Sequence, residues 1–225
     1  MKVFGIIPAR GGSKSIPLKN IKLLNGKPLI EYTIETALAS KVLDRIAIST
    51  DHEDIIRICQ QYEEIDVIVR PPELATDEAP TEWTLLHACD EIIKKDNFLP
   101  DVVLTLEPTS PLRSIQTIKQ CIDIFKTTDA DSVIGVTETR ACYGKIVDGR
   151  FEYLFPNQPR RRQERKPLYK ESSTIYATKL DTLRYKNSVL GEKLYTLIIS
   201  CNEAIDINES FDFKLIEALI NLKKG

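Results

Sequence analysis

The sequence lacks several of the residues and motifs on which common enzyme sites are built. It has only two histidines and no CxxC pair among its five cysteines, so neither a zinc site nor a Ser-His-Asp triad is expected. The nucleotide-binding patterns GxxxxGK[ST] and GxGxxG are also absent. Any chemistry must therefore be carried by lysine, arginine, aspartate and backbone amides.

The chain also has no excess of positive charge and no long apolar segment. Its formal net charge of -2 at pH 7 argues against a protein that binds nucleic acid. No apolar run has the length needed to span a bilayer, and the N-terminus lacks the pattern of a signal peptide. Scattered cysteines, odd in number, indicate a reducing compartment. We therefore expect a cytoplasmic protein without a membrane partner.

The 225 residues are enough for one domain with a full hydrophobic core. Short apolar runs, expected as strands at 3–7, 45–49, 66–69, 102–106 and 132–136, alternate with segments of helical periodicity. Helices are expected at 28–38, in the segment that STDHEDI begins at 49–55, at 81–93 and at 114–125. This alternation predicts a mostly parallel sheet covered on both faces, in which ligands bind beyond the carboxyl ends of the strands.

The pattern changes after residue 140. Residues 141–170 contain an expected hairpin that turns at Asp148-Gly149, followed by the basic segment QPRRRQERKP. Such a segment is either a solvated loop or an arm laid on another subunit. Strands at 172–178 and 194–199 and a helix at 208–222 complete the chain. We divide it into an α/β core at 1–140, an arm at 141–171 and a completion of the core at 172–225. The apolar face expected for the last helix consists of Phe211, Leu215, Leu219 and Leu222.

The segment after the first strand, IIPARGGSKSIPLKN at 6–20, has the composition of a phosphate-binding loop. Gly11 and Gly12 allow backbone N–H groups to approach a ligand closely. Arg10, Lys14 and Lys19 add positive charge where phosphate oxygens would lie. The alternative is a solvated connection. On the binding interpretation, the segment is a cradle for a triphosphate.

PARGGSKSIPLKN resembles the nucleotide-binding signature of the CMP-sialic acid synthetase family, the cytidylyltransferases that activate sialic acids and related 2-keto sugar acids. The signature usually has glycine where this chain has Ser15. Further motifs follow in the family's order, so the resemblance extends from Ile6 to Glu217. It implies a Rossmann-like, doubly wound fold of the nucleotide-diphospho-sugar transferase type with a small protruding dimerisation arm. The implied reaction joins CTP to a sugar acid and gives a CMP-sugar and pyrophosphate.

The resemblance also implies site residues in the first two motifs. In the phosphate loop, the implied nucleotide contacts are Ala9, Arg10, Gly11, Gly12, Lys14 and Asn20. Arg10, Lys14 and Lys19 are implied to be catalytic, together with Asp206 of the last motif, with Arg10 at the α-phosphate and Lys19 close to the reacting centre. RPPELATDEAPT at 70–81 resembles the family's loop over the nucleoside, which adds the contacts Arg70, Ala79 and Thr81. Thr81 could instead be only a helix N-cap.

The sugar-binding motifs depart from the family pattern. LEPTSPLR at 106–113 resembles LQPTSPLR, with Glu107 in place of glutamine, while Thr109, Ser110 and Arg113 offer donors to an acidic ligand. A carboxylate cannot donate a hydrogen bond as an amide does, and it repels a sugar carboxylate, so the change affects which sugar is bound. Alternatively, Glu107 faces solvent or pairs with a local arginine.

RRQERKPLYKESSTIYAT resembles the family segment in which RQ leads to a strand usually reading NGAIY. Arg162 matches the arginine that, in that family, reaches the sugar carboxylate from the neighbouring subunit, and Lys145 lies near a lysine with a similar role. Tyr176 keeps the aromatic residue, whereas Ser172-Ser173 replaces Asn-Gly. The resemblance thus implies a homodimer with shared active sites, and sugar contacts at Glu107, Lys145, Arg162 and Tyr176.

AIDINESFDFKLIE resembles the segment whose two aspartates, as DID, hold Mg²⁺ in that family. This chain keeps Asp206 and has Asn208 in the second place, and an asparagine can give one neutral oxygen to a hard cation. The alternatives are a turn role for Asp206 and a capping role for Asn208. No residue stands out as a general base.

Two other functions remain open from the sequence: a nucleotidylyltransferase that acts on a sugar 1-phosphate, and a nucleotide-binding protein without catalysis. The departures at 107, 172, 173 and 208 are the only support for the second. The sugar acid could be a sialic acid, a deaminated relative or a diamino-nonulosonate such as legionaminic or pseudaminic acid, and the altered pocket favours the last group.

Overall fold

The centre of the fold is one seven-stranded sheet with the strand order β11-β7-β10-β6-β1-β4-β5 in a computed structural model that describes residues 1–224. The strands are β1 (Val3–Pro8), β4 (Arg45–Thr50), β5 (Ile65–Val69), β6 (Val102–Thr105), β7 (Ser132–Thr139), β10 (Leu168–Lys179) and β11 (Leu194–Ile198). Strands β1, β4, β5 and β6 are parallel to one another, and β11 is parallel to β7. Strand β10 is antiparallel to both of its neighbours. The predicted Rossmann-like, mostly parallel α/β sheet is confirmed.

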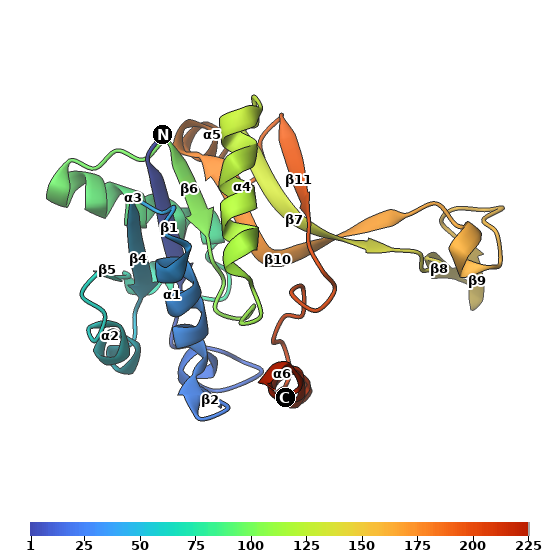
Figure 1. Ribbon diagram of the computed structural model, residues 1–225, viewed down its shortest axis with the longest axis horizontal. Coiled ribbons are helices and arrows are strands. Elements are labelled where there is room, and N and C mark those ends of the chain that lie inside the picture. Colours follow the sequence, from blue (N-terminus) through green and yellow to red (C-terminus); the bar gives the residue numbers. More distant parts are fainter. Residues whose placement is uncertain (225) are drawn as a thin grey trace.

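Helices cover both faces of this sheet (Figure 1). Helices α1 (Leu29–Ser40), α2 (Glu53–Cys59) and α4 (Ile115–Thr127) pack on one face, and α3 (Thr81–Asp96) and α5 (Leu180–Lys186) pack on the other. Side chains alternate along β1, so Val3 and Ile7 join the first core cluster whereas Phe4 and Ile6 join the second. A strand buried on both faces must be apolar throughout, which explains the continuous run in the sequence.

Several boundaries differ from the sequence-based expectation. Strand β10 begins at Leu168 rather than 172, because its first half pairs with the extended end of β7 outside the core. Helix α5 and the small hairpin β2 (Leu23–Leu24) and β3 (Lys27–Pro28) were not predicted. Within residues 1–224, no helix combines the length and the apolar character needed to cross a membrane.

The segment after β7 projects from the core as an arm (Figure 1). It contains the predicted hairpin, formed by β8 (Gly144–Val147) and β9 (Arg150–Tyr153). Asp148 (φ 50°) and Gly149 (φ 76°) form its turn, and both adopt the left-handed conformation that two-residue hairpin turns require. Large apolar side chains on this arm are exposed, including Ile146 at 77% and Phe151 at 56%.

The last helix, α6 (Ser210–Lys224), packs against the phosphate loop rather than against the sheet. Phe213 and Ile216 are buried with Ile16 of that loop, and Leu219 packs at the edge of the cluster. The predicted apolar face of this helix was therefore wrong in most of its members, because Phe211, Leu215 and Leu222 are exposed. Both sets have helical spacing, and only the docking partner distinguishes them.

Candidate active site

Two adjoining cavities open at the carboxyl ends of β1, β5 and β6. The first, of about 250 Å³, lies between the phosphate loop and residues 70–84, and we call it the loop cavity. The second, of about 450 Å³, lies between the end of β6, strand β10 and residues 206–208, and we call it the strand cavity. The two cavities share four lining residues: Lys19, Thr81, Glu107 and Thr109. Ligands bound in the two cavities would therefore contact each other along this wall.

The phosphate loop is anchored to the end of β4. The backbone N–H of Ala9 donates to the carbonyl of Ser49 at 2.9 Å, and the N–H of Gly11 donates to the Asp51 carboxylate at 2.8 Å. A Cβ at Gly11 would lie 2.5 Å from the His52 ring, whereas Gly12 faces open space. Gly11 is thus required for close packing, which the sequence pattern could not distinguish from a role in binding.

Two of the expected nucleotide contacts, Ala9 and Gly11, offer no free group to the loop cavity in this structure. Ala9 is fully buried in the core and does not line the loop cavity, because it continues the inward-facing row of β1. The amide of Gly11 is already occupied by Asp51, so it does not point into the cavity as a free donor. Gly12 and Asn20 do line the loop cavity, and the Asn20 amide donates to the Arg10 carbonyl at 3.0 Å.

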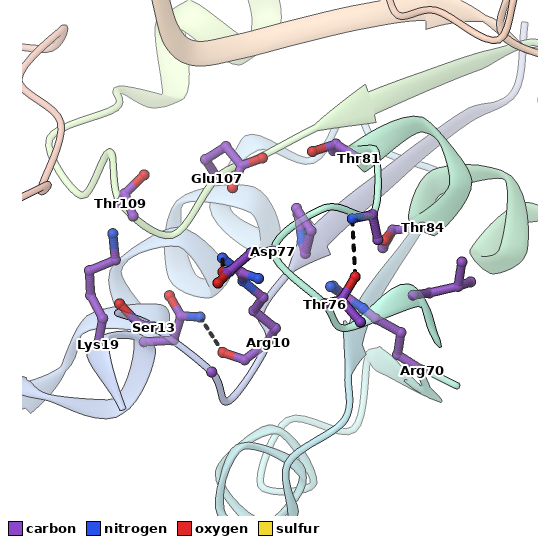
Figure 2. A pocket seen from close by; sticks show the side chains of 15 residues that line it. Arg10, Ser13, Lys19, Arg70, Thr76, Asp77, Thr81, Thr84, Glu107 and Thr109 are labelled. Atoms are coloured by element: carbon purple, nitrogen blue, oxygen red, sulfur yellow. Dashed lines mark hydrogen bonds and ion pairs between the residues drawn. The ribbon is translucent and has the colours of Figure 1, made fainter. Parts of the chain in front are cut away.

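The cations in and beside the loop cavity come from two segments, the phosphate loop and the end of β5; Arg10, Lys19 and Arg70 line the cavity (Figure 2), whereas Lys14 does not. The Arg10 guanidinium pairs with Asp77 at 2.5 Å, and the Lys14 ammonium, at the exposed rim, pairs with the same carboxylate at 2.6 Å. The Lys19 ammonium donates to the Ile207 carbonyl at 3.0 Å. Arg70 is buried and donates to the Ser49 carbonyl at 2.8 Å. Burial lowers the pKa of Arg70 below its ordinary value.

The loop between β5 and α3 forms one wall of the loop cavity. The Thr76 hydroxyl accepts from the Ala79 N–H at 3.2 Å, which shapes the turn before the helix (Figure 2). Ala79 and Thr81 line the cavity. Pro80 holds the N-cap position of α3 and Thr81 is the first helical residue, so the alternative role of Thr81 as N-cap is wrong.

Glu107 lies on the wall between the two cavities and is partly buried. Burial, reinforced by the charge of Asp206, raises the pKa of its carboxyl group to about 7, against the opposing effect of Arg113, Arg70 and Lys19. No described residue forms an ion pair with this carboxylate, so the alternative that Glu107 pairs with a local arginine is not observed. The side chain is available to a ligand from either cavity.

Arg113 has a structural role and is not the ligand donor that its motif suggested. It is fully enclosed and donates to the carbonyls of Thr174 at 2.5 Å and Glu107 at 2.8 Å, and to the Thr33 hydroxyl at 3.3 Å. Burial lowers the pKa of Arg113 to about 10. Its guanidinium ties the LEPTSPLR loop to β10, where the strand departs from regular pairing.

That irregularity in β10 builds the strand cavity. The register with β7 shifts between Ser172 and Tyr176, and the intervening bulge directs Ser173 and Tyr176 toward the cavity. The Tyr176 hydroxyl donates to Glu171 at 2.8 Å. Ser172 is buried beside Thr174, with 2.8 Å between their hydroxyl oxygens, so it does not reach a ligand.

Asp206 and Asn208 line the same cavity. The Asp206 carboxylate accepts a long hydrogen bond of 3.4 Å from Ser110 and forms no ion pair with any described residue. The start of α6 is held by Asp212, whose carboxylate accepts from the N–H groups of Asn208 at 2.8 Å and Glu209 at 2.7 Å. No described residue bonds to the Asn208 side chain, so its proposed capping role is not observed.

Two expected sugar contacts lie outside both cavities. Lys145 is on β8 and pairs with Glu152 of β9 at 3.4 Å. Arg162 is exposed in a short 3-10 turn at the tip of the arm (Arg162–Glu164). The arm extends away from the core of its own chain (Figure 1). A single chain therefore does not bring these cations to the site.

The structure adds residues that the sequence analysis missed. Asp77 is the most consequential, because it pairs with two of the expected phosphate-binding cations. Its place in RPPELATDEAPT was the only available signal. The other additions line the cavities: Ser13, Leu74, Thr76, Thr84, Glu82 and Glu171.

Comparisons with known proteins agree with this geometry. The sequence profile of the cytidylyltransferase family matches residues 4–208. The chain is 33% identical over 230 residues to a CMP-N,N'-diacetyllegionaminic acid synthase of Legionella pneumophila, covering 100% of this chain and 98% of that protein. It is 30% identical over 220 residues to an N-acylneuraminate cytidylyltransferase of Streptococcus agalactiae, covering 95% of this chain but only 52% of that protein. A solved CMP:2-keto-3-deoxy-manno-octonic acid synthetase complexed with CTP has a similar fold, with a TM-score of 0.72, 16% identity and coverage of 99% and 100% of the two chains.

Proposed function

The chain belongs to the cytidylyltransferase family, and from this premise we propose that it joins CTP to a 2-keto-3-deoxy sugar acid of the nonulosonic class, with release of pyrophosphate. The observation that carries the proposal is the shared wall of the two cavities. The loop cavity has the cations Arg10, Lys19 and Arg70, which suit a nucleoside triphosphate, and the strand cavity has acceptors suited to a polyhydroxylated sugar. The wall between them is where the two substrates would react.

The proposed nucleotide site is the loop cavity. Arg10 and Lys14 provide positive charge for phosphate oxygens, and Gly12 leaves space for close approach of the backbone. Buried Arg70 fixes the far wall beside Ala79 and Thr81. Positioning and charge neutralisation account for most of the catalysis of phosphoryl and nucleotidyl transfer, and this cavity offers both.

The proposed acceptor site is the strand cavity. Its lining includes four carboxylates, from Glu82, Glu107, Glu171 and Asp206, and a single cation, Lys19. Carboxylates accept hydrogen bonds, so they suit a sugar rich in hydroxyl and amide N–H donors, as the diamino-nonulosonates are. The same carboxylates repel the carboxylate of a sugar acid. The site therefore needs positive charge from outside the single chain.

We propose that part of this charge comes from the arm of a second copy. Lys145 and Arg162 are on that arm and contact neither cavity of their own chain. The arm also exposes Ile146 and Phe151, which a partner subunit would cover. A guanidinium matches a carboxylate with two parallel hydrogen bonds, so Arg162 of the partner subunit would orient the sugar acid. The proposed assembly is a homodimer with shared active sites.

A divalent cation such as Mg²⁺ is proposed as the second source of charge. Asp206 and Asn208 offer a carboxylate and an amide oxygen on one wall, and neither is bonded to a cation of the described chain. Within residues 1–224, no group of three or more His, Cys, Asp or Glu side chains forms a metal site, so phosphate oxygens of CTP would complete the coordination. When bound there, Mg²⁺ would neutralise charge on the leaving pyrophosphate.

In the proposed reaction, the C2 hydroxyl of the sugar acid attacks the α-phosphorus of CTP in line, the bond to pyrophosphate breaks, and the hydroxyl proton is released to solvent. Arg10 holds the α-phosphate, and Lys19, on the shared wall, lies beside the forming bond. Tyr176 and Glu107 orient the sugar from the strand cavity.

All five cysteines are free thiols, within the part of the chain that the structure describes, which supports a reducing, cytoplasmic location.

The direct test measures pyrophosphate release with CTP, Mg²⁺ and a panel of nonulosonic acids, with sugar 1-phosphates as controls. Turnover only with a sugar phosphate, or tight CTP binding without any turnover, would contradict the proposal. Mixing Arg162→Ala and Lys14→Ala subunits tests the shared site, because each mixed dimer regains one intact site and an equal mixture should recover about a quarter of the activity. Mixed dimers that form but stay inactive would exclude action of the arm across the interface.

A further inference from the structure

Asp77 occupies the position between Arg10 and Lys14 that an anionic ligand would be expected to take. Its two carboxylate oxygens contact the two cations separately, one at 2.5 Å from Arg10 and the other at 2.6 Å from Lys14. The residue is on the loop after β5, and its side chain points over the phosphate loop into the loop cavity (Figure 2). Both cations for which we propose a phosphate-binding role are therefore already paired with one carboxylate of the protein itself, which offsets one of their two positive charges.

We propose that Asp77 is a displaceable counter-ion that determines which nucleotides this site accepts. The inference rests on the proposed function, since it concerns the binding of CTP. A ligand must supply more negative charge than one carboxylate to take both cations from Asp77. A triphosphate supplies enough negative charge to displace Asp77, and a single phosphate displaces it less well. An uncharged nucleoside does not compete for the cations.

The geometry of the pairs makes displacement feasible. The side chains are exposed to solvent by 33% at Arg10, 82% at Lys14 and 30% at Asp77, so both ion pairs are accessible and individually weak. The loop that carries Asp77 is held by local bonds, such as the one from the Ala79 N–H to Thr76, which survive a rotation of the Asp77 side chain. The two cations lower the pKa of Asp77, so the carboxylate remains charged at neutral pH.

This arrangement has a consequence for turnover. After transfer, the CMP-sugar retains one phosphodiester charge near the cations, whereas CTP carried the full polyphosphate. Asp77 can then pair again with Arg10 and Lys14, and this competition favours release of the product over its retention. Asp77 is thus a specificity-determining residue that discriminates by ligand charge.

Calorimetric titration of wild type, Asp77→Asn and Glu78→Gln with CTP, CMP and cytidine tests the inference. Glu78 is the matched control, because it is exposed on the same loop and forms no ion pair with any described residue. Removing the competing carboxylate should tighten CTP binding by about two- to tenfold and leave cytidine binding unchanged. Glu78→Gln should reproduce wild-type affinities for all three ligands.

The sign of the effect separates the alternatives. If Asp77 only orients the two cations for the ligand, Asp77→Asn will weaken CTP binding, and the inference is wrong. Equal effects of Asp77→Asn and Glu78→Gln, or no effect of either, would also overturn it, as these outcomes indicate only general electrostatics or no competition. If wild type does not bind CTP at all, the proposed function fails and this inference fails with it. Thermal melts of both variants verify that they are folded.

Discussion

Replacing Glu107 by glutamine should stabilise the protein, and the gain should depend on pH. Glu107 is partly buried between the two cavities, where burial and the charge of Asp206 raise its pKa from 4.5 to about 7. The folded protein therefore binds this proton more tightly than the unfolded chain does. Glutamine has nearly the same shape and never ionises, so it removes the electrostatic penalty without creating a cavity.

The magnitude follows from proton linkage. Well below pH 4.5 Glu107 is protonated in both the folded and the unfolded protein, so its ionisation does not change the free energy of unfolding. As the pH rises from 4.5 to about 7, the unfolded chain loses its proton first, and the wild-type protein loses stability. At about 1.4 kcal/mol per pH unit, the upper limit of this loss is about 3 kcal/mol. Because the side chain keeps some contact with water, we expect a gain of about 2 kcal/mol in Glu107→Gln at pH 8.

Urea denaturation of both proteins at intervals between pH 4.5 and 8, in EDTA, measures the difference. The gain should be small at pH 4.5, grow with pH and level off above pH 7. In an Asp206→Asn background the pKa of Glu107 falls, so the gain at pH 8 should shrink. A gain that is constant with pH would refute the reasoning, because it would reflect packing rather than ionisation. A loss of stability at pH 8 would show that the charged carboxylate is stabilised by a partner.

Two further predictions concern packing around the site. Gly11→Ala places a Cβ 2.5 Å from the His52 ring and should lower the free energy of unfolding by about 1–3 kcal/mol. Gly12→Ala meets no atom within 4 Å and should change the free energy of unfolding by less than about 0.5 kcal/mol. Equal denaturation midpoints for the two variants would contradict the packing role of Gly11. Arg113→Leu removes the donor to the buried Thr174 carbonyl and leaves the Glu107 carbonyl with only the Ser110 N–H at 3.3 Å, so it should destabilise by about 2–4 kcal/mol, measured by the same denaturation. A near-neutral result would mean that water replaces the guanidinium.

Most of the fold could be predicted from the local pattern of the chain. Strands β1, β4, β5, β6 and β7 are short apolar runs because the sheet is buried on both faces, and the helices between them carry apolar residues at helical spacing. The hairpin turn at Asp148-Gly149 follows from residues that tolerate positive φ. These features depend on neighbours in sequence, so periodicity is sufficient to detect them.

The face of α6 and the full extent of β10 could not be predicted in this way. Phe213 and Phe211 are both apolar and both fit a helical stripe, and only the contact with the phosphate loop selects the first. Strand β10 begins early because β7 extends beside it, a pairing between segments that are far apart in the chain. Long-range partners decide such cases.

The sequence by itself determined the class of fold, the order of the motifs and the chemical types available for binding, because these depend on residue identity and local spacing. Only the tertiary structure decided which of those groups are free. It tied Arg113 and the Gly11 amide to protein acceptors, paired Arg10 and Lys14 with Asp77, and left Lys145 and Arg162 outside both cavities of their own chain. Hydrogen bonds and ion pairs depend on distances of a few ångströms between segments far apart in sequence, and those distances exist only after folding.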